Sequence, residues 1–388
     1  MNFAPRMPVR SEALALTLAV EPGFDFAGAE YRALQQSSAS SAFQAPGWLD
    51  ALHRDVGVAF GAEPVTVTIR HESDGHLMLV LPLARTRRAG VTYLEFVDFG
   101  LCDYLGPVYD LAEAHLLLAD ASLPQRLAAA LPGHDLIALT KLAGEDPLMA
   151  HLFPAARRAR MRISAYPAQL RGDWKTWRDA ALDPSQRREL DMKRRRLDRT
   201  GKQTFELLRD ADEITRAFEA LRRYRTERFK ALGAPDVLDN EVIFTFYRRM
   251  AIEGARDGAT RTQCLCLDGK PVAVMFGLAQ RSVYSMLMVG LDIARHGRLS
   301  PGLLAIEDSM RAAIEAGDRV YDFTIGDHPY KLRFGGKAIP LHEWYQPRTV
   351  RGYAAIFGIT LVREAKRKLV PLLKRRASIA AKVSSAQD

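Results

Sequence analysis

Hydrophobic and polar residues alternate along the first half of the chain in a pattern that predicts strands and helices in turn. The apolar run 13–20 predicts a strand, and segments 24–36 and 40–57 have the spacing of amphipathic helices. Three strand-like runs separated by turn residues predict an antiparallel meander, at 65–71, 76–84 and 91–96. A helix at 123–131 and a strand at 136–140 complete this half.

The second half repeats the same order of elements. Its predicted strands lie at 203–208, 260–268, 271–279, 283–291 and 319–323, and its predicted helices at 211–232, 240–257 and 300–316. Asp268-Gly269 is a favoured pair for a two-residue hairpin turn between the first two strands of this meander. Because the halves share their element order without sequence identity, we expect a tandem arrangement of two similar α/β units.

Length and composition favour two packed units in a reducing compartment. The chain has 388 residues, which is long for a single core, and its 48% hydrophobic and 26% charged residues are ordinary for a soluble protein. Cys102, Cys264 and Cys266 have no CxxC spacing, so we expect buried small side chains rather than a metal or redox site. Run 13–20 lacks a cleavage site after it, and no stretch approaches the ~18 apolar residues of a membrane span. A cytoplasmic protein is therefore expected.

Basic residues are concentrated in two places in this chain of net charge +9. Segment 186–202 contains eight Arg or Lys residues, and it predicts either a solvated helix between lobes or an anion-binding face. From residue 353 onward, apolar and basic residues share a helical pattern, and segment 351–376 holds eight basic residues and one acidic residue. This tail predicts either a contact with an anionic membrane or a helix docked on its own domain.

Familiar catalytic motifs are absent, including GxSxG, HExxH and the glycine-rich nucleotide loops, and the nine histidines show no metal-ligand spacing. The start of helix 300–316 is a better candidate, because Ser300 suits the N-cap and Pro301 the first helical position. Gly302 would leave the backbone open to a ligand, and Arg295 and Arg298 lie just upstream. These features predict an anion site at the helix N-terminus, and a well-capped helix without a ligand is the alternative.

A second polar group follows strand 319–323. Asp322, Asp327, His328, Tyr330 and Lys331 lie at its C-terminal end, and such side chains are able to move protons. The alternative is that they are turn and surface residues.

Several pieces of the sequence together resemble one bacterial family. They are FQAPGWL at 43–49, Asp103-Tyr104, RRELDMKRRRLDRTG at 187–201, LSPGLL at 299–304 and YDFTIGDHPYKLRF at 321–334. In this order they look like the BioF-like, CelD-type acetyltransferases of the GNAT superfamily, which are similar to the Fem-type aminoacyl transferases.

The resemblance implies an α/β fold of two tandem GNAT-like lobes, each with a mixed, mostly antiparallel sheet flanked by helices. We expect an N-terminal lobe at 1–170, a basic linking helix at 171–202, the acyltransferase lobe at 203–348 and a basic amphipathic tail at 349–388.

The resemblance also implies that acyl-CoA, most simply acetyl-CoA, is the donor and that no metal is needed. Ser300, Pro301 and Gly302 fall where GNAT proteins hold the cofactor pyrophosphate, with Arg295 and Arg298 beside them. The usual Arg/Gln-x-x-Gly-x-Gly/Ala motif is replaced here by Arg-Leu-Ser-Pro-Gly at 298–302.

For the chemistry, Tyr330 matches the tyrosine that protonates the leaving thiolate in many GNAT enzymes, and Lys331 matches the lysine that follows it. Asp322, Asp327 or His328 is then expected to take a proton from the attacking group.

Three functions are open at this point. The first is acyl transfer from acyl-CoA to an amine or hydroxyl of an envelope or exopolysaccharide-related acceptor. The second is a Fem-type transferase that uses aminoacyl-tRNA, the only nucleic acid expected as a partner. The third is an inactive accessory protein of polysaccharide biosynthesis. In each case we expect a cytoplasmic protein, and the first of the two interpretations of the tail would place it at the inner membrane.

Overall fold

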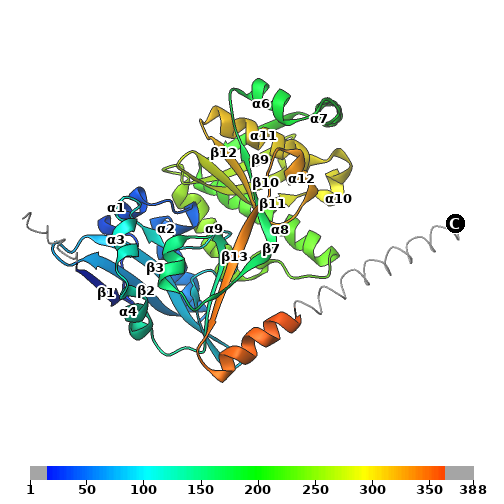
Figure 1. Cartoon of the computed structure of the whole chain (residues 1–388). Coiled ribbons are helices and arrows are strands. Elements are labelled where there is room, and N and C mark those ends of the chain that lie inside the picture. Colours follow the sequence, from blue (N-terminus) through cyan, green and yellow to red (C-terminus); the bar gives the residue numbers. More distant parts are fainter. Residues whose placement is uncertain (1–14, 363–388) are drawn as a thin grey trace, which may run out of the picture.

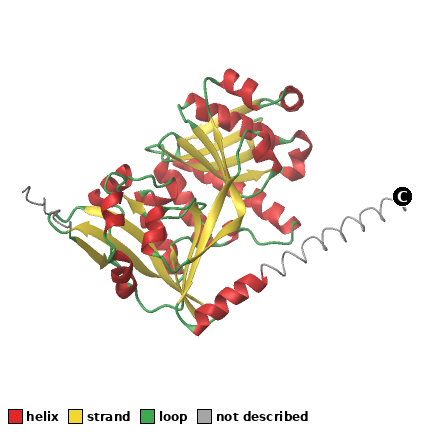
Figure 2. Cartoon of the chain, in the orientation of Figure 1, coloured by secondary structure: helices red, strands yellow, loops and turns green. Residues whose placement is uncertain are grey.

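The computed structural model of the chain describes residues 15–362 as two lobes that share one continuous sheet (Figure 1). The strands in spatial order are β1 (Leu16–Val20), β2 (Glu63–His71), β3 (Leu77–Arg88), β4 (Val91–Phe96), β6 (Leu136–Ala143), β13 (Ile339–Pro347), β7 (Arg157–Gln169), β12 (Val320–Ile325), β11 (Val283–Leu291), β10 (Lys270–Gln280), β9 (Thr260–Leu267) and β8 (Gln203–Leu208), and β5 (Val108–Tyr109) pairs with β3. Only the β4–β6 and β11–β12 pairs of this sheet are parallel. The predicted mixed, mostly antiparallel α/β fold is therefore confirmed, with helices on the faces of the sheet (Figure 2).

The N-terminal lobe runs from β1 to α5. Its helices are α1 (Ala29–Ser37), α2 (Pro46–Ala51), α3 (Ala114–Ala119), α4 (Leu123–Ala130) and α5 (Pro147–Leu152). The helical segment expected at 40–57 is confirmed in part, because a separate 3-10 turn at Ala42–Gln44 precedes α2, which continues directly into a π-helix at Leu52–Gly57. Ser41 and Gln44 form a capping box at the 3-10 turn, and Pro46 begins α2.

The C-terminal lobe runs from α6 to α12. Its helices are α6 (Trp174–Ala181), α7 (Pro184–Asp198), α8 (Ala211–Ala231), α9 (Glu241–Gly254), α10 (Ile293–His296), α11 (Pro301–Glu315) and α12 (Pro329–Arg333). The hairpin turn predicted between β9 and β10 is confirmed, since Asp268 and Gly269 have φ angles of 49° and 72°.

The basic segment predicted as a helix is α7, and it packs against α11. Arg194 lies 2.7 Å from Asp308 and 3.1 Å from Glu307, both on α11, and Arg178 of α6 also pairs with Glu307 at 2.8 Å. Part of the positive charge of α7 therefore holds the helix on the C-terminal lobe.

The two lobes exchange a strand, which the sequence did not indicate. β7 follows the N-terminal lobe but pairs with β12 of the C-terminal lobe, and β13 follows the C-terminal lobe but pairs with β6 of the N-terminal lobe. β7 and β13 also pair with each other, so they join the two half-sheets (Figure 1). Each lobe is completed by a strand from the other half of the sequence.

Two hydrophobic cores stabilise this arrangement. The larger core fills the N-terminal lobe and continues under α8 and α9, through residues such as Phe218 and Phe246. The smaller core lies under α6, α7 and α11, with Trp177, Leu197 and Met310 among its members. Between residues 15 and 362, no helix is long and apolar enough to cross a membrane.

Candidate active site

The parallel strands β11 and β12 separate directly after Ser285 and Asp322. Their pairing ends at this register, although β11 continues to Leu291 and β12 to Ile325. The separation arises in β12, where Thr324 has a left-handed φ of 56° and the register against β7 shifts between Asp322 and Ile325. Such a backbone is costly for a β-branched residue, so surrounding contacts must hold it in place.

Lys331 supplies these contacts from α12. Its ammonium donates to the backbone carbonyls of Phe323, Thr324 and Ile325 at 2.7, 3.2 and 2.7 Å. An ammonium has three N–H donors, and all three are used here. The side chain is only 2% exposed, and burial lowers its pKa to about 8, against the opposing effect of the Asp103 and Asp322 carboxylates. Lys331 thus lies beside Asp322, as expected, but its charge fixes the strand end.

The N-terminal lobe reaches this strand end through Tyr104. The Tyr104 hydroxyl donates to Asp322 Oδ2 at 2.6 Å, and the Thr324 amide donates to Asp322 Oδ1 at 2.8 Å. Burial raises the pKa of Asp322, while these two hydrogen bonds and the charge of Lys331 act in the opposite direction. Asp322 is therefore the predicted site residue at which the two lobes meet.

Asp103 brings a second carboxyl group to the same place. The Thr324 hydroxyl lies within hydrogen-bonding reach of the Asp103 carboxylate and, at 3.2 Å, of the Met286 carbonyl oxygen. Burial raises the pKa of Asp103 to about 6, and the like charge of Asp322 adds to this effect. Asp103 and Tyr104 appeared in the sequence only as a matching motif. Nothing in the local pattern showed that they face Asp322, more than 200 positions away.

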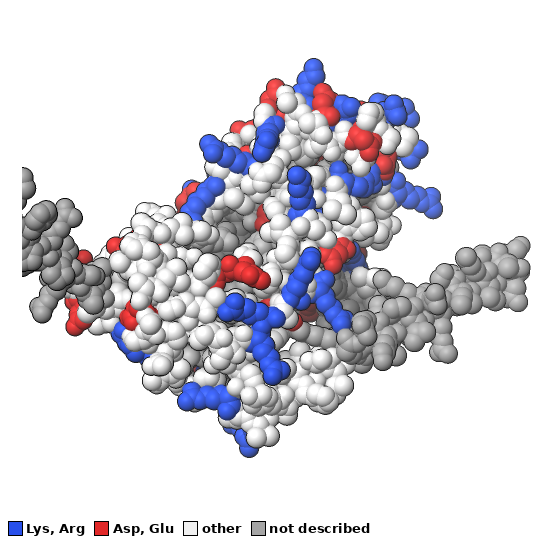
Figure 3. Space-filling view, in the orientation of Figure 1, with Lys and Arg blue, Asp and Glu red and all other residues white. Residues whose placement is uncertain are grey.

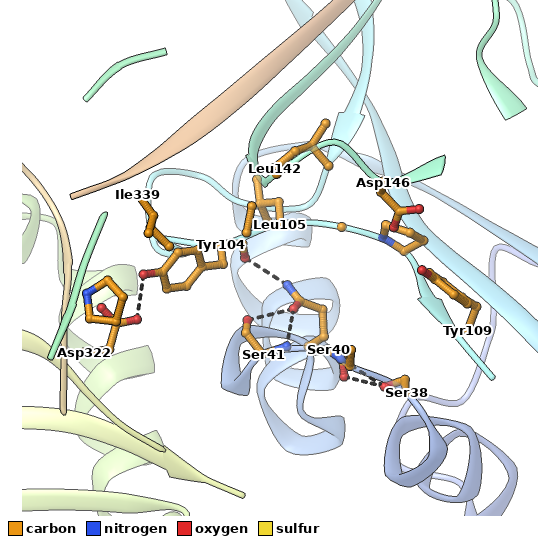
Figure 4. Close-up of a pocket in the computed structure, with 17 residues that line it drawn as sticks. Ser38, Ser40, Ser41, Tyr104, Leu105, Tyr109, Leu142, Asp146, Asp322 and Ile339 are labelled. Carbon is orange, nitrogen blue, oxygen red and sulfur yellow. Dashed lines mark hydrogen bonds between the residues drawn. The ribbon is translucent and has the colours of Figure 1, made fainter. Parts of the chain in front are cut away.

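A cavity of about 370 Å³ opens between the lobes next to this cluster (Figure 4). Its lining includes the loop Ser38–Ser41 and side chains from both lobes, among them Gln44, Tyr104, Tyr109, Asp146 and Asp322. A neighbouring cavity of about 380 Å³ shares the serine loop, Tyr104 and Asp322, and adds Arg281 and Ser285. Asp322 therefore lines a space large enough for a small substrate group.

The serine loop at the wall of these cavities is held from both lobes. Gln44 Nε2 donates to the Tyr104 carbonyl at 2.9 Å, and the Gln44 side chain also accepts from Ser41. From the other lobe, the Arg281 guanidinium donates to the carbonyls of Ser40, at 3.1 Å, and of Gln35. These bonds fix the distance between the serine loop and Asp322.

The other predicted proton-transfer residues lie on the α12 side of Asp322. Asp327 accepts from the Tyr166 hydroxyl at 2.8 Å, and His328 stacks on Tyr330 with ring centroids 5.8 Å apart. The Tyr330 hydroxyl has no hydrogen-bond partner among residues 15–362, and burial raises its pKa to about 12. The lining of the 370 Å³ cavity includes none of the three residues Asp327, His328 and Tyr330.

The predicted anion site has the expected helix but different local details. The upstream basic loop is ordered as α10 and a 3-10 turn at Gly297–Leu299, and Arg295 and Arg298 are exposed there. Ser300 precedes α11 with a left-handed φ of 55° and makes no capping hydrogen bond, so the expected side-chain cap is wrong.

Pro301 begins α11, as predicted. The Gly302 position has a packing reason of its own, because a Cβ there would lie 2.8 Å from the Leu291 side chain at the end of β11. The described residues contain no cluster of His, Cys, Asp or Glu that could hold a metal ion. The three cysteines are buried, as expected.

Residues 184–332 match the acetyltransferase (GNAT) domain family. The C-terminal lobe is a GNAT acetyltransferase domain. This domain supports an acyltransferase activity of the GNAT type, and the GNAT family uses acyl-CoA donors. The narrower resemblance to BioF-like, CelD-type proteins stays a prediction. No curated protein is similar in sequence to the chain.

Several solved structures share the fold of both lobes. FemX has a TM-score of 0.58 at 12% identity over 84% of this chain and 97% of its own. A conserved protein of unknown function from Bacteroides thetaiotaomicron has a TM-score of 0.54 at 10% identity, over 86% of this chain and all of its own. L-PGS from Bacillus licheniformis has a TM-score of 0.52 at 12% identity, over 89% of this chain and 98% of its own. At these identities the similarity shows the fold alone.

Proposed function

We propose that the protein transfers an acyl group, most simply acetyl, from acyl-CoA to an amine or hydroxyl of an envelope or exopolysaccharide-related acceptor. The observation that carries this proposal is the position of Asp322. Its carboxylate lies where β11 and β12 separate in the GNAT lobe, and it also lines the cavity between the lobes. A donor held by the GNAT lobe and an acceptor in the cavity would meet at this point.

The donor is expected at the N-terminal end of α11. The first backbone N–H groups of a helix and its dipole favour an anion, and the exposed cations Arg295 and Arg298 lie just before it. Ser300, Pro301 and Gly302 would then approach the diphosphate through their backbone. Because Gly302 packs against Leu291, a bulky substitution there would also disturb β11. Arg298→Glu, at an exposed position, tests the donor site more cleanly.

The transfer itself needs one proton removed and one returned. The acceptor nitrogen or oxygen attacks the thioester carbonyl, the carbon–sulfur bond breaks, and the thiolate leaves. Asp322, which Tyr104 holds in position, would take the proton of the attacking group. The raised pKa of Asp103 makes that carboxyl group suitable for the same task. Tyr330 would return a proton to sulfur, and its unpaired hydroxyl agrees with that role. Asp327 and His328 then orient α12 through Tyr166 and Tyr330.

The test is release of free CoA from acetyl-CoA in the presence of sugar, amino-sugar and lipid-linked acceptors. Tyr330→Phe keeps the ring and removes the proton, so turnover should fall about 10²-fold while acetyl-CoA affinity stays nearly unchanged. Tyr353→Phe, on an exposed helix far along the chain, serves as the matched control. Turnover of Tyr330→Phe within about threefold of the parent would remove Tyr330 from the mechanism.

Aminoacyl-tRNA is the alternative donor to acyl-CoA, and one observation on the basic helix region supports it. Arg188, Arg195, Arg196 and Arg199 of the basic helix region are exposed and make no ion pair with residues 15–362. Figure 3 shows Lys and Arg side chains spread over the C-terminal lobe. Such a face would suit a nucleic acid backbone, and the fold is that of FemX. Thermal stabilisation by acetyl-CoA but not by charged tRNA would decide for the first donor.

The proposed place of action is the cytoplasm, at the inner face of the membrane. An acceptor that belongs to the envelope or to an exopolysaccharide would be met there, and the basic C-terminal tail would bring the enzyme to it. Residues 363–388 of that tail lie outside the described residues.

A further inference from the structure

The helix that follows β13 begins at residue 350 and carries a row of exposed apolar side chains. Val350, Tyr353, Phe357 and Leu361 are 85%, 58%, 66% and 53% exposed. Residues spaced by three or four positions lie along one side of an α-helix, so these four side chains form one continuous stripe. We call them the apolar stripe. A contiguous, exposed apolar surface of this kind is typical of a site that binds a protein or a membrane.

The start of this helix is fixed to the N-terminal lobe. The Arg348 amide donates to the Asp135 carbonyl at 2.8 Å, and the Thr349 hydroxyl donates to Asp135 Oδ1 at 2.5 Å. Gly352 lies so close to this loop that a Cβ would be 2.0 Å from the Asp135 carbonyl oxygen. The close contact explains the glycine, and it sets the direction in which the helix leaves the body of the protein (Figure 1).

The helix that carries the stripe contains one basic residue, Arg351, and the sequence that follows residue 362 is strongly basic. Segment 351–376 contains eight basic residues and one acidic residue, and Arg351 is the first of them. In the region where the helix begins, the surface is mostly uncharged apart from a few Lys and Arg side chains (Figure 3). An apolar stripe combined with dense positive charge is the pattern of a helix that lies on an anionic lipid surface.

The positive charge of segment 351–376 also argues against a second copy of the chain as the partner of the apolar stripe. A second copy of the chain would bring two segments of high positive charge together, and their repulsion opposes such a dimer. A lipid surface satisfies both features at once, because apolar side chains enter the headgroup boundary while nearby basic residues are attracted to anionic headgroups.

We infer that helix 350–362 docks the protein on an anionic membrane surface, with the apolar stripe turned toward the lipid. This inference rests on the place of action proposed above and names the residues that would hold the protein there, and it does not depend on the transfer reaction. It adds to the charge of the tail a specific set of contact residues in the described part of the chain.

The test uses the full chain and vesicles of phosphatidylglycerol mixed with phosphatidylcholine, compared with vesicles of phosphatidylcholine alone. Phe357→Asp places a charge in the middle of the stripe and should weaken binding to the anionic vesicles by about tenfold or more. Val362→Asp is the matched control, because Val362 is 55% exposed and the substitution adds the same charge to the same helix. It points roughly 140° away from Phe357 and should change binding by less than about threefold.

Equal loss of binding in the two variants, or unchanged binding in Phe357→Asp, would overturn the inference. A change of oligomeric state in Phe357→Asp, measured by light scattering without lipid, would assign the stripe to a second copy instead and would also overturn it. Both variants should keep the unfolding temperature of the parent, since both side chains are exposed. Acetyl transfer to a soluble acceptor should be unchanged, so failure of docking and failure of the proposed reaction give different results.

Discussion

The two lobes use the same strand geometry, and we propose a reaction site in only one of them. β6 and β12 each run parallel to a preceding strand over three residue pairs, and each then meets an exchanged strand with a shift in register. At that shift Lys141 in β6 has a φ of 59° and Thr324 in β12 has a φ of 56°. The last paired residues differ in chemistry: Glu95 and Ala138 in the N-terminal lobe, Ser285 and Asp322 in the C-terminal lobe.

A lysine stabilises each distorted strand end in a different way. Lys141 binds the Asp98 carboxylate at 2.7 Å and the Cys102 carbonyl at 2.6 Å, so its charge is neutralised within its own lobe. Lys331 instead binds only backbone carbonyls and leaves the neighbouring carboxyl groups available. The same loop that Lys141 fixes carries Asp103 and Tyr104 to the other lobe. The N-terminal lobe has therefore become the support of the site in the C-terminal lobe.

The largest expected effect is on Asp322. Asp322→Asn keeps the size of the side chain and most of its hydrogen bonds but removes the proton acceptor, so kcat should fall about 10²–10⁴-fold. Ala138→Ser, at the equivalent register of β6, should leave kcat within about twofold. Steady-state release of CoA measures both, and comparable rates for Asp322→Asn and the parent would move the base elsewhere.

The next effect separates the two lysines. Lys331→Met leaves three buried carbonyls without a donor, so the free energy of unfolding should fall by about 3 kcal/mol and activity should be lost with it. Lys141→Met should destabilise by about 2 kcal/mol by leaving Asp98 without its ion-pair partner, while the folded fraction should keep more activity than folded Lys331→Met, because Lys141 acts on the site only through the loop of Asp103 and Tyr104. Denaturant unfolding with activity measured per folded molecule tests this contrast, which would fail if both variants lost activity alike.

Asp103 should make stability depend on pH. The pKa of the Asp103 carboxyl group is about 6 in the folded protein, and its ordinary value is 3.8. At pH values between 3.8 and about 6, the folded state holds a proton that the unfolded state has released. The free energy of unfolding therefore falls as the pH rises, by up to about 3 kcal/mol. Asp103→Asn should remove this fall and be more stable than the parent at pH 7. Asp98→Asn should be less stable at that pH, because it loses the ion pair with Lys141. Chemical unfolding across pH 4–8 compares the two.

The smallest effect concerns the contact between the lobes. Tyr104→Phe removes the hydrogen bond to Asp322 and should lower the free energy of unfolding by about 1–2 kcal/mol and kcat by about tenfold. Tyr109→Phe, on the opposite wall of the cavity, is the control for loss of a hydroxyl. If the two variants have the same kcat, Tyr104 does not position Asp322.

Local sequence patterns were enough to predict most elements and one part of the site. The strands expected at 91–96, 203–208 and 283–291 have the same limits in β4, β8 and β11, because their alternating patterns end at clear turn residues. Asp322 was proposed as a site residue because it lies near the end of the predicted strand 319–323, beside other polar groups.

The remaining features depend on contacts between residues far apart in the chain. The pairing of β7 with β12 and of β13 with β6 has no local signal, and neither has the bond between Tyr104 and Asp322. Gly302 was attributed to ligand approach, and the structure adds a second reason for this glycine, the close packing of the Leu291 side chain. A local pattern can mark a position as special without showing which neighbour makes it so.

The strand exchange has a consequence for how the protein is made. β6 receives its second neighbour only from β13, and β13 lies near the end of the chain at Ile339–Pro347. During synthesis the N-terminal half therefore leaves the ribosome with β6 as an open edge, and it keeps that edge until β13 has been translated. Open edges of this kind pair readily with other chains. Premature termination between α5 and β13 would consequently release an aggregation-prone fragment, even though all of the N-terminal lobe's own residues were present.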